Sequence, residues 1–434
     1  MRKINQLIIM LLVAATLCVA CNTPINKAKE KEAEIVAIPT INYDALAEAL
    51  QTAFQTKDTA LITPFLSPNF TVSTQSWPAS AFMLQQIVLH SNLDCKVEFP
   101  KKELVKADVE DGLFNLPVNY VFKDTTQTSN IVFTADGKIL YLDFFDQRYG
   151  LFRNRESKLV DKIPFEFKEG KIIVKLRLND NSKELNFLFD TGADGMAIPA
   201  SLAKEVGLKV TRRQSTSVVG AHVDVQISSG NTVHLGKVSI PNRNIAIFNS
   251  ERDNTDGIIG ITLANNYIVK VNFDESVIYL YSLGNLEHNE SEKKVSVIVP
   301  RGLAIVHAGI NLVGNEEVPG NFIFDTGANY NLVCFNNYVR KHKMLVSGFK
   351  YDDVASMVSM GQSTVVYNGR AKQFYLGNKD IVVDDMPVTL QASSGNSSWN
   401  PSGNGSLGIR FMKDYNFTLD LTKRAIYFDK RGGN

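Results

Sequence analysis

The 434-residue chain contains little cysteine and no excess of charge of either sign. Its four cysteines include no Cys-x-x-Cys pair, so neither a metal framework nor a disulfide framework can be deduced from them. Cys334 lies in the apolar run "NLVCF", which favours a packed core thiol over a nucleophile. The formal net charge is +1, which gives no reason to expect a nucleic-acid partner or an anionic membrane surface.

Several catalytic motifs are also absent from the sequence. The six histidines are scattered and none forms His-Glu-x-x-His, so metalloprotease chemistry has no support. No Gly-x-Ser-x-Gly elbow and no Walker A loop occur either. We therefore expect no metal and no cofactor. Hydrophobic residues make up 44% and charged residues 21%, which is typical of a folded soluble protein, and the length suffices for about three domains.

The N-terminal residues read as an export signal. Arg2 and Lys3 precede an apolar run over 7–20, which is too short for a confident membrane-spanning helix. The stretch "LCVAC" resembles a bacterial lipobox, which implies cleavage after residue 20 and lipidation of Cys21, although a leucine usually stands where Cys18 does. An ordinary secretory signal is the alternative. We expect residues 1–20 to be the signal and 21–40 a flexible tether. The chain would then be an exported lipoprotein, anchored in the bacterial cell envelope and facing the periplasm or the surface.

Residues 41–150 indicate a small α+β domain. The stretches "YDALAEALQTAFQTKD" and "ASAFMLQQIVLHS" have helical spacing. Strand-like runs follow, and "NIVFTADGKILYLDFFD" contains an Ala-Asp-Gly-Lys hairpin turn. Helices followed by a meander resemble the cone-shaped NTF2-like domain. The role of this region, whether spacer, docking surface or inhibitory cover, stays open.

The rest of the chain is rich in strand signals and contains an internal repeat. "NFLFDTGADG" begins at Asn186 and "NFIFDTGANY" at Asn321. Each copy continues with a short helical stretch, a β-rich segment that holds a glycine, and an apolar-apolar-Gly triplet ("GIIG" and "GSLG") before two more strands. We expect one lobe over 157–285 and a second over 295–431, joined by the charged linker "GNLEHNESEKK".

Two Asp-Thr-Gly-Ala segments with matching downstream elements resemble the aspartic proteases, and among them the retropepsin-like branch, because alanine follows the glycine. The resemblance implies a mainly β, two-lobed acid-protease fold of β-barrels and an aspartic endopeptidase that acts on peptides or proteins. It implies a catalytic dyad of Asp190 and Asp325. It also implies loop residues that brace the dyad and donate amides to it, which are Thr191, Gly192, Ala193, Thr326, Gly327 and Ala328.

The chemistry explains why two carboxyls would be buried together. Hydrolysis of a peptide without a metal or a covalent intermediate needs a base that activates water and an acid that protonates the substrate. Two carboxyls that share one proton supply both, since like charges so close cannot both ionise. Ala193 and Ala328 lack the hydroxyl that contacts the aspartates in pepsin-like enzymes, so we expect a working range less acidic than that of pepsin.

Other assignments remain open from sequence alone. Gly220 and Gly361 lie in hairpins that could be flaps over a bound peptide or ordinary sheet hairpins. The lobes could instead form a non-catalytic peptide-binding or sensing module. Phosphate-gripping ATPases also repeat an Asp-x-Gly loop, but the region is too rich in β signals for their alternating plan. We expect a monomer with the dyad formed within one chain, while pairing with a lobe of another chain is the alternative.

Overall fold

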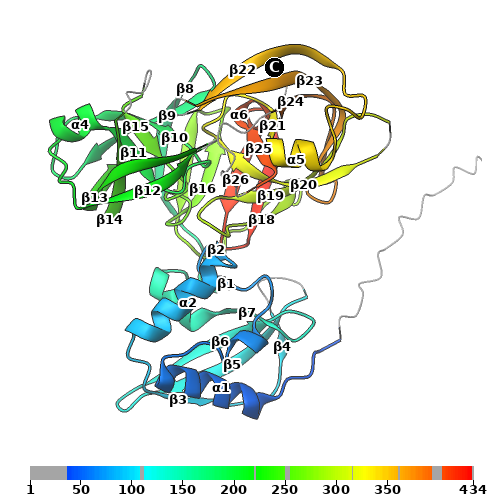
Figure 1. Cartoon of the computed structure of the whole chain (residues 1–434). Coiled ribbons are helices and arrows are strands. Elements are labelled where there is room, and N and C mark those ends of the chain that lie inside the picture. The colour runs from blue at the N-terminus through cyan, green and yellow to red at the C-terminus, as the bar shows by residue number, and fades with distance from the viewer. Residues whose placement is uncertain are drawn as a thin grey trace, which may run out of the picture. The chain divides into compact units, whose positions relative to one another are not determined.

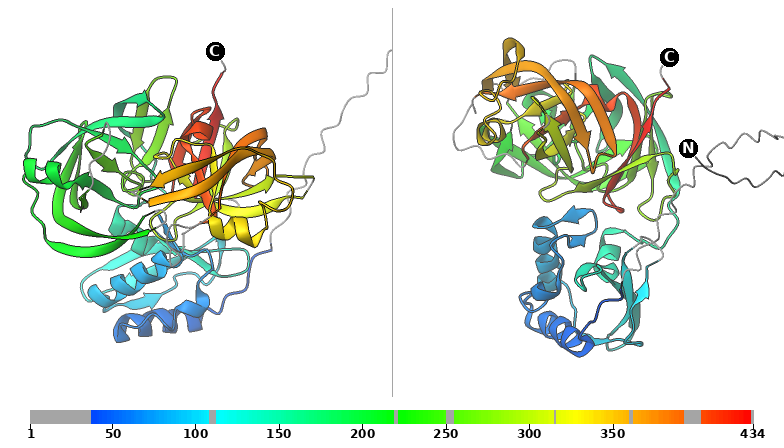
Figure 2. Two further views of the ribbon diagram at one scale, coloured as in Figure 1. Left: turned by 45° about the horizontal axis from the view of Figure 1, so that its top comes forward. Right: turned by 90° about the vertical axis from the view of Figure 1, so that its right-hand side faces the viewer.

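The structure is a computed structural model that describes residues 37–107, 112–218, 221–249, 255–314, 316–359, 362–392 and 403–432. Residues 38–434 form one compact unit, to which the description below refers. The predicted fold class is confirmed, because the chain is mainly β, with two repeated lobes that follow a small α+β region. Figures 1 and 2 show the lobes in green and in yellow to red.

The α+β region contains the helices α1 and α2, shorter helical turns, and an antiparallel sheet in the order β3-β5-β6-β7, with β4 against β5. Helix α1 begins after Asn42, whose side chain accepts the amide of Ala45, and buries Leu46, Leu50 and Phe54 on one face. The elements are α1 (Tyr43–Thr56), η1 (Thr63–Phe65), β1 (Thr71–Val72), β2 (Gln75–Ser76), α2 (Ala79–His90), β3 (Lys96–Glu98), β4 (Val105–Lys106), β5 (Phe114–Val121), β6 (Thr126–Phe133), β7 (Ile139–Leu142), α3 (Asp143–Asp146) and η2 (Gln147–Tyr149).

The Ala-Asp-Gly-Lys hairpin is confirmed, but the strand after it is shorter than expected. Gly137 adopts a positive φ of 76° in the turn between β6 and β7. Strand β7 ends at Leu142, and 143–146 form the helical turn α3 instead of more strand. A tertiary contact explains the difference, because the turn places the buried carboxylate of Asp146 against Arg153 and the amide of Ser73.

In the described residues, the first lobe consists of strands and one short helix. They are β8 (Leu159–Lys168), β9 (Lys171–Leu178), β10 (Leu185–Phe189), β11 (Met196–Pro199), α4 (Ala200–Glu205), β12 (Arg212–Val218), β13 (Ala221–Leu235), β14 (Val238–Phe248), β15 (Gly257–Ile259), β16 (Ile268–Asn272) and β17 (Val277–Tyr281).

The second lobe repeats this order of strands and adds a short helix, α6, after β25. Its elements are β18 (Lys293–Ile298), β19 (Ile305–Asn311), β20 (Val318–Asp325), β21 (Leu332–Cys334), α5 (Asn336–Lys341), β22 (Tyr351–Ser359), β23 (Gln362–Leu376), β24 (Ile381–Gln391), β25 (Gly405–Gly408), α6 (Ile409–Met412), β26 (Tyr415–Asp420) and β27 (Ala425–Lys430).

Strand pairing within the two lobes follows the same plan. Strand β10 pairs parallel with β15 and antiparallel with β9, just as β20 pairs with β25 and β19. Strand β11 pairs parallel with β14, just as β21 pairs with β24. The repeat seen in the sequence is therefore a repeat of hydrogen-bonding topology.

One antiparallel sheet joins the lobes. Its strands run in the order β8-β17-β16-β26-β27-β18, and the β16–β26 pairing, between Val269–Val271 and Phe417–Leu419, connects the two halves. Because backbone hydrogen bonds cross this junction, the sheet fixes the register of one lobe against the other.

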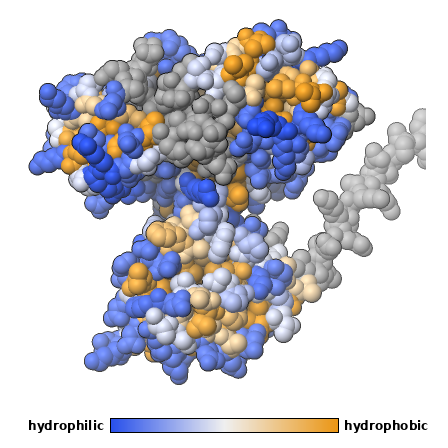
Figure 3. Space-filling view, in the orientation of Figure 1, coloured by the Kyte–Doolittle hydropathy of each residue, from blue (hydrophilic) through white to orange (hydrophobic). Residues whose placement is uncertain are grey.

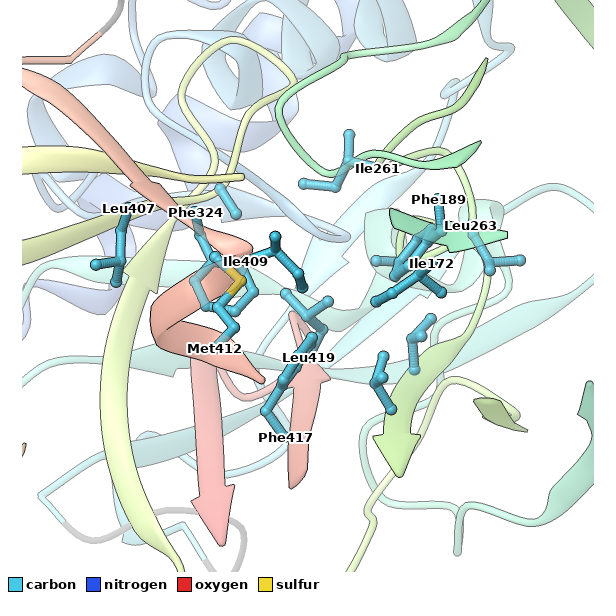
Figure 4. Close-up of a cluster of buried hydrophobic side chains, with 14 of the residues drawn as sticks. Ile172, Phe189, Ile261, Leu263, Phe324, Leu407, Ile409, Met412, Phe417 and Leu419 are labelled. Carbon is cyan, nitrogen blue, oxygen red and sulfur yellow. The ribbon is translucent and has the colours of Figure 1, made fainter. Parts of the chain in front are cut away.

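A single hydrophobic core continues through both lobes. Figure 4 shows a part of this core, in which Phe189 and Leu263 of the first lobe and Phe324 and Leu419 of the second lie in one cluster. Phe189 and Phe324 are fully buried and immediately precede Asp190 and Asp325. The core therefore anchors both strands that carry the predicted dyad.

The outer surface carries a mixture of polar and apolar residues. The face in Figure 3 is mainly hydrophilic, with hydrophobic residues in scattered groups. Among the described residues, no helix has the length and apolar character needed to span a membrane.

Candidate active site

Asp190 and Asp325 follow equivalent strands of the two lobes. Asp190 comes directly after β10, and its amide donates to the carbonyl of Ile259 on the parallel strand β15. Asp325 is the last residue of β20 and lies opposite Gly408 of β25. Each carboxyl therefore extends from the end of a buried strand that a second, parallel strand supports.

The two threonines bind the lobes together across the site. The hydroxyl of Thr191 donates to the carbonyl of Phe324 at 2.5 Å, and that of Thr326 donates to the carbonyl of Phe189 at 2.7 Å. Each hydroxyl also accepts the amide of the opposite threonine, at 3.0 and 3.1 Å. Both side chains are fully buried. Four reciprocal hydrogen bonds thus hold the two Asp-Thr-Gly loops face to face.

The glycines bring each loop against the aspartate of the other lobe. A methyl group added at Gly192 would lie 2.4 Å from Cγ of Asp325, and one added at Gly327 would lie 2.2 Å from Cγ of Asp190. Only glycine fits at such distances. Each glycine amide also donates to Oδ1 of the aspartate in its own loop, at 3.0 Å in both cases. The structure therefore brings the two predicted carboxyls together.

The electrostatics of Asp325 are those of a paired, buried acid. Burial raises the pKa of its carboxyl well above the usual range, and the charge of Asp190 and a hydrogen bond with the Asp190 carboxyl raise it further. Hydrogen bonds from Ser406 and from the amide of Gly327 act in the opposite direction. Two carboxyls that interact this strongly titrate as a pair, because the charge of one disfavours ionisation of the other.

Ser406 is a site residue that the sequence reasoning missed. Its hydroxyl donates to Oδ2 of Asp325 at 3.0 Å, and it also forms a hydrogen bond with the phenol of Tyr330. Asp325 therefore has a hydroxyl partner from another strand, although Ala328 of its own loop supplies none. The signal available was the serine in "GSLG", a polar residue where the first repeat has Ile258 in "GIIG".

Glycines beneath the loops are required by close backbone packing. A methyl group at Gly260 would lie 2.3 Å from the carbonyl oxygen of Ala193, and one at Gly408 would lie 2.7 Å from that of Ala328. The same two carbonyls accept the amides of Ile261 and Ile409 at 2.9 Å. The alanines thus contribute their backbone to the loops, and the apolar-apolar-Gly segments support the loops from below.

Three predicted site residues cannot be placed. Cys21, Gly220 and Gly361 lie outside the described residues. Of the hairpins that carry the two glycines, the structure describes the flanking strands, in which β12 pairs antiparallel with β13 and β22 with β23. Cys334 is fully buried and burial raises the pKa of its thiol, which confirms its assignment to the core.

Sequence comparison supports the class of protein that this geometry indicates. Residues 174–263 match a family model described as aspartyl protease. The matched segment spans 90 of the 434 residues and includes Asp190 and Gly260 of the first lobe. This segment of the first lobe is therefore similar in sequence to aspartyl-protease domains.

Among solved structures, the chain is similar to the crystal structure of an aspartic proteinase from Irpex lacteus. The identity is 11%, the match covers 63% of this chain and 97% of that protein, and the TM-score is 0.40. No curated protein matches the chain in sequence.

Proposed function

We propose that this chain is an aspartic endopeptidase whose active site is formed by Asp190 and Asp325, one from each lobe. The observation that supports this most directly is the reciprocal packing of the two Asp-Thr-Gly loops, in which each glycine touches the other lobe's aspartate. A closely packed, partly buried pair of carboxyls is costly in a protein that does not use it. The aspartyl-protease match over 174–263 supports the same reaction class.

In this proposal, the dyad works with one carboxyl protonated and the other ionised. The ionised carboxyl takes a proton from a water molecule, whose oxygen attacks the carbonyl carbon of the peptide. The protonated carboxyl gives its proton to the carbonyl oxygen, which yields a neutral tetrahedral diol. The proton held by the dyad then passes to the nitrogen, and the dyad takes a proton from one hydroxyl of the diol as the C–N bond breaks. The products are a carboxylic acid and an amine, and the dyad again holds one proton.

The test replaces one carboxyl at a time. Asp190→Asn and Asp325→Asn each remove the shared proton site with little change in shape, so we expect cleavage of a peptide library to fall by at least about a thousandfold, since acid and base catalysis both depend on the pair. Asp124→Asn makes the same chemical change at an exposed position far from the dyad in sequence and serves as the control. Proteolysis that survives either dyad variant would exclude this mechanism.

The peptide-binding alternative predicts a different outcome. Library peptides would bind to the wild-type chain, as measured by fluorescence anisotropy, but no product would appear by mass spectrometry at any pH. The same library identifies the residues preferred around the cleaved bond.

We extend the proposal to a single chain as the active species, because the described loops of one chain complete the pair of carboxyls. Light scattering across an active chromatographic peak tests this, and activity confined to a dimer peak would contradict it.

We also propose that the chain is an exported envelope lipoprotein anchored through Cys21, with residues 41–150 as an NTF2-like domain that precedes the protease lobes in the sequence. The sequence of residues 1–21 supports the anchor, and the order of helices and strands in 41–150 supports the domain. Metabolic labelling with a fatty-acid analogue should mark the wild type and leave Cys21→Ala unmarked. Label on both proteins, or on neither, would contradict the anchor.

A further inference from the structure

The Oδ1 atoms of the two aspartates accept equivalent hydrogen bonds, but the supporting strands β15 and β25 differ in one residue. Gly192 and Gly327 make equivalent hydrogen bonds of 3.0 Å to the aspartates of their own loops. In the first lobe Leu188 of β10 pairs with Ile258 of β15, and in the second Ile323 of β20 pairs with Ser406 of β25. Ser406 therefore occupies the register position of Ile258 and brings a hydroxyl that the first lobe lacks at that position.

Ser406 is buried in apolar surroundings. Only 1% of its surface is exposed, and its strand neighbours are Ile323 on one side and Val333 on the other. A hydroxyl buried there costs free energy unless it forms a hydrogen bond. The available partners are Oδ2 of Asp325 at 3.0 Å and the phenol of Tyr330. The position of Ser406 is thus favourable only because it contacts the dyad.

Tyr330 extends this contact into a chain of hydrogen bonds. Ser406 has one proton and donates it to Asp325, so it accepts from the phenol of Tyr330. Burial and the nearby charges of Asp325 and Asp190 raise the pKa of the Tyr330 phenol well above its usual value, which keeps it a donor. In this series of hydrogen bonds, Tyr330 donates to Ser406 and Ser406 donates to the carboxylate of Asp325.

We propose, on the basis of the function proposed above, that Ser406 is a positioning residue that holds the shared negative charge of the dyad on Asp325, with Tyr330 as its support. The hydrogen bond from Ser406 thereby offsets part of the rise in the pKa of Asp325 that burial and the charge of Asp190 cause. Ser406 would supply, from a different strand and in the second lobe, the hydroxyl that is missing after both Asp-Thr-Gly segments.

The proposal has a definite pH consequence. The titratable groups that face Asp325 are Asp190, after β10, and Tyr330, in the loop after β20. A hydroxyl that donates to the ionised carboxyl lowers the pKa at which the dyad loses its first proton. Loss of the hydroxyl raises that pKa, so the acid limb of kcat/KM moves to higher pH and activity falls at acid pH.

The test compares Ser406→Thr with Ser406→Val, two side chains of one shape that differ in the hydroxyl. We expect the acid limb of the valine variant to lie about 0.5 to 1 pH unit above that of the threonine variant, and its kcat/KM on that limb to be about three to ten times lower. Superimposed profiles would overturn the proposal. Ser406→Ala, compared with wild type, repeats the test if the larger side chains prevent folding. Tyr330→Phe should give a smaller shift in the same direction.

A stability measurement separates this inference from the proposed function. The hydroxyl favours the ionised dyad. The threonine variant should therefore have a higher Tm than the valine variant, and this difference in Tm should grow as pH rises through the acid limb. A gap that stays constant with pH would mean a purely structural serine and would refute the inference. If wild type cleaves nothing, the endopeptidase proposal fails, yet this measurement still decides whether Ser406 acts on the dyad.

Discussion

At the scale of single residues, the site depends on the lack of a side chain at Gly192 and Gly327. The glycines of the two Asp-Thr-Gly segments have no side chain, and each occupies the space against the opposite carboxyl. Steric exclusion therefore limits how each loop approaches the opposite aspartate, while the threonine hydroxyls hold the two loops together. Both effects cross the boundary between the lobes, so neither lobe can arrange its own carboxyl alone.

Gly327→Ala should separate the dyad without removing a carboxyl. The added methyl would lie 2.2 Å from Cγ of Asp190, so that side chain must move, and a displacement of about 1 Å in a catalytic group can cost about 100-fold in rate. We expect kcat to fall by about that factor in a peptide assay. Gly195→Ala is the matched control, because its methyl meets no atom within 4 Å. Equal activity of the two variants would argue against a sterically defined dyad.

At the scale of elements, the short helix α3 shows tertiary structure overriding local propensity. The run "ILYLDFFD" has the composition of a strand, yet its last four residues turn into α3. The turn buries Asp146 with Arg153 at 2.7 Å, with side-chain exposures of 1% and 4%, and Asp146 also accepts the amide of Ser73. One buried ion pair therefore decides where β7 stops.

Asp146→Ala should destabilise the fold strongly. Removal of the carboxylate leaves the Arg153 guanidinium buried without its charge partner, which typically costs about 3–5 kcal/mol in the free energy of unfolding. Urea denaturation followed by circular dichroism measures the change, and the double variant with Arg153→Met should recover part of the loss. Glu98→Ala, which breaks the exposed pair with Lys96, should change stability by less than about 1 kcal/mol. If Asp146→Ala and Glu98→Ala lowered the free energy of unfolding by similar, small amounts, the stabilising role assigned to the Asp146–Arg153 ion pair would be contradicted.

At the scale of the whole protease region, the shared sheet and the linker between β17 and β18 connect the lobes. His288 of that linker lies between two carboxylates, with Nε2 3.0 Å from Asp420 and Nδ1 3.3 Å from Glu292, and stacks on Tyr427. Burial disfavours its charged form, but the hydrogen bonds and charges of the two acids outweigh burial and raise the pKa of His288. Glu292 is also buried, yet His288 lowers its pKa.

The His288 cluster should make stability depend on pH. A raised histidine pKa gives stability that is present below about pH 6.5 and is lost as pH rises, and a lowered Glu292 pKa gives stability that is lost at low pH, below about 4.5. The gap in Tm between wild type and His288→Gln should therefore be largest near pH 5–6 and smaller at pH 8–9. His307→Gln, at an exposed histidine, is the control. A gap independent of pH would show that His288 is not charged in the fold.

The sequence predicted the parts of the site that local patterns carry. Asp190 and Asp325 could be predicted to form a pair because the motif around each is repeated together with its downstream elements. The structure brings these two residues together. Ser406 and His288 could not be predicted this way. Ser406 is 81 residues from its partner Asp325, and His288 is 132 residues from Asp420, so both contacts depend on strand register that the sequence does not state. His288 is a buried histidine that bridges two acids, and the scattered histidines of the sequence gave no sign of that pairing.

The β16–β26 junction has a consequence for how such a site can change over generations. A site built from two identical chains must carry every residue twice, so a substitution that helps one half is imposed on the other. Here two covalently joined halves are encoded separately while the common sheet keeps them in register. Each half can therefore acquire its own residue at a matching position, and Ile258 and Ser406 are one such divergence beside the paired acids.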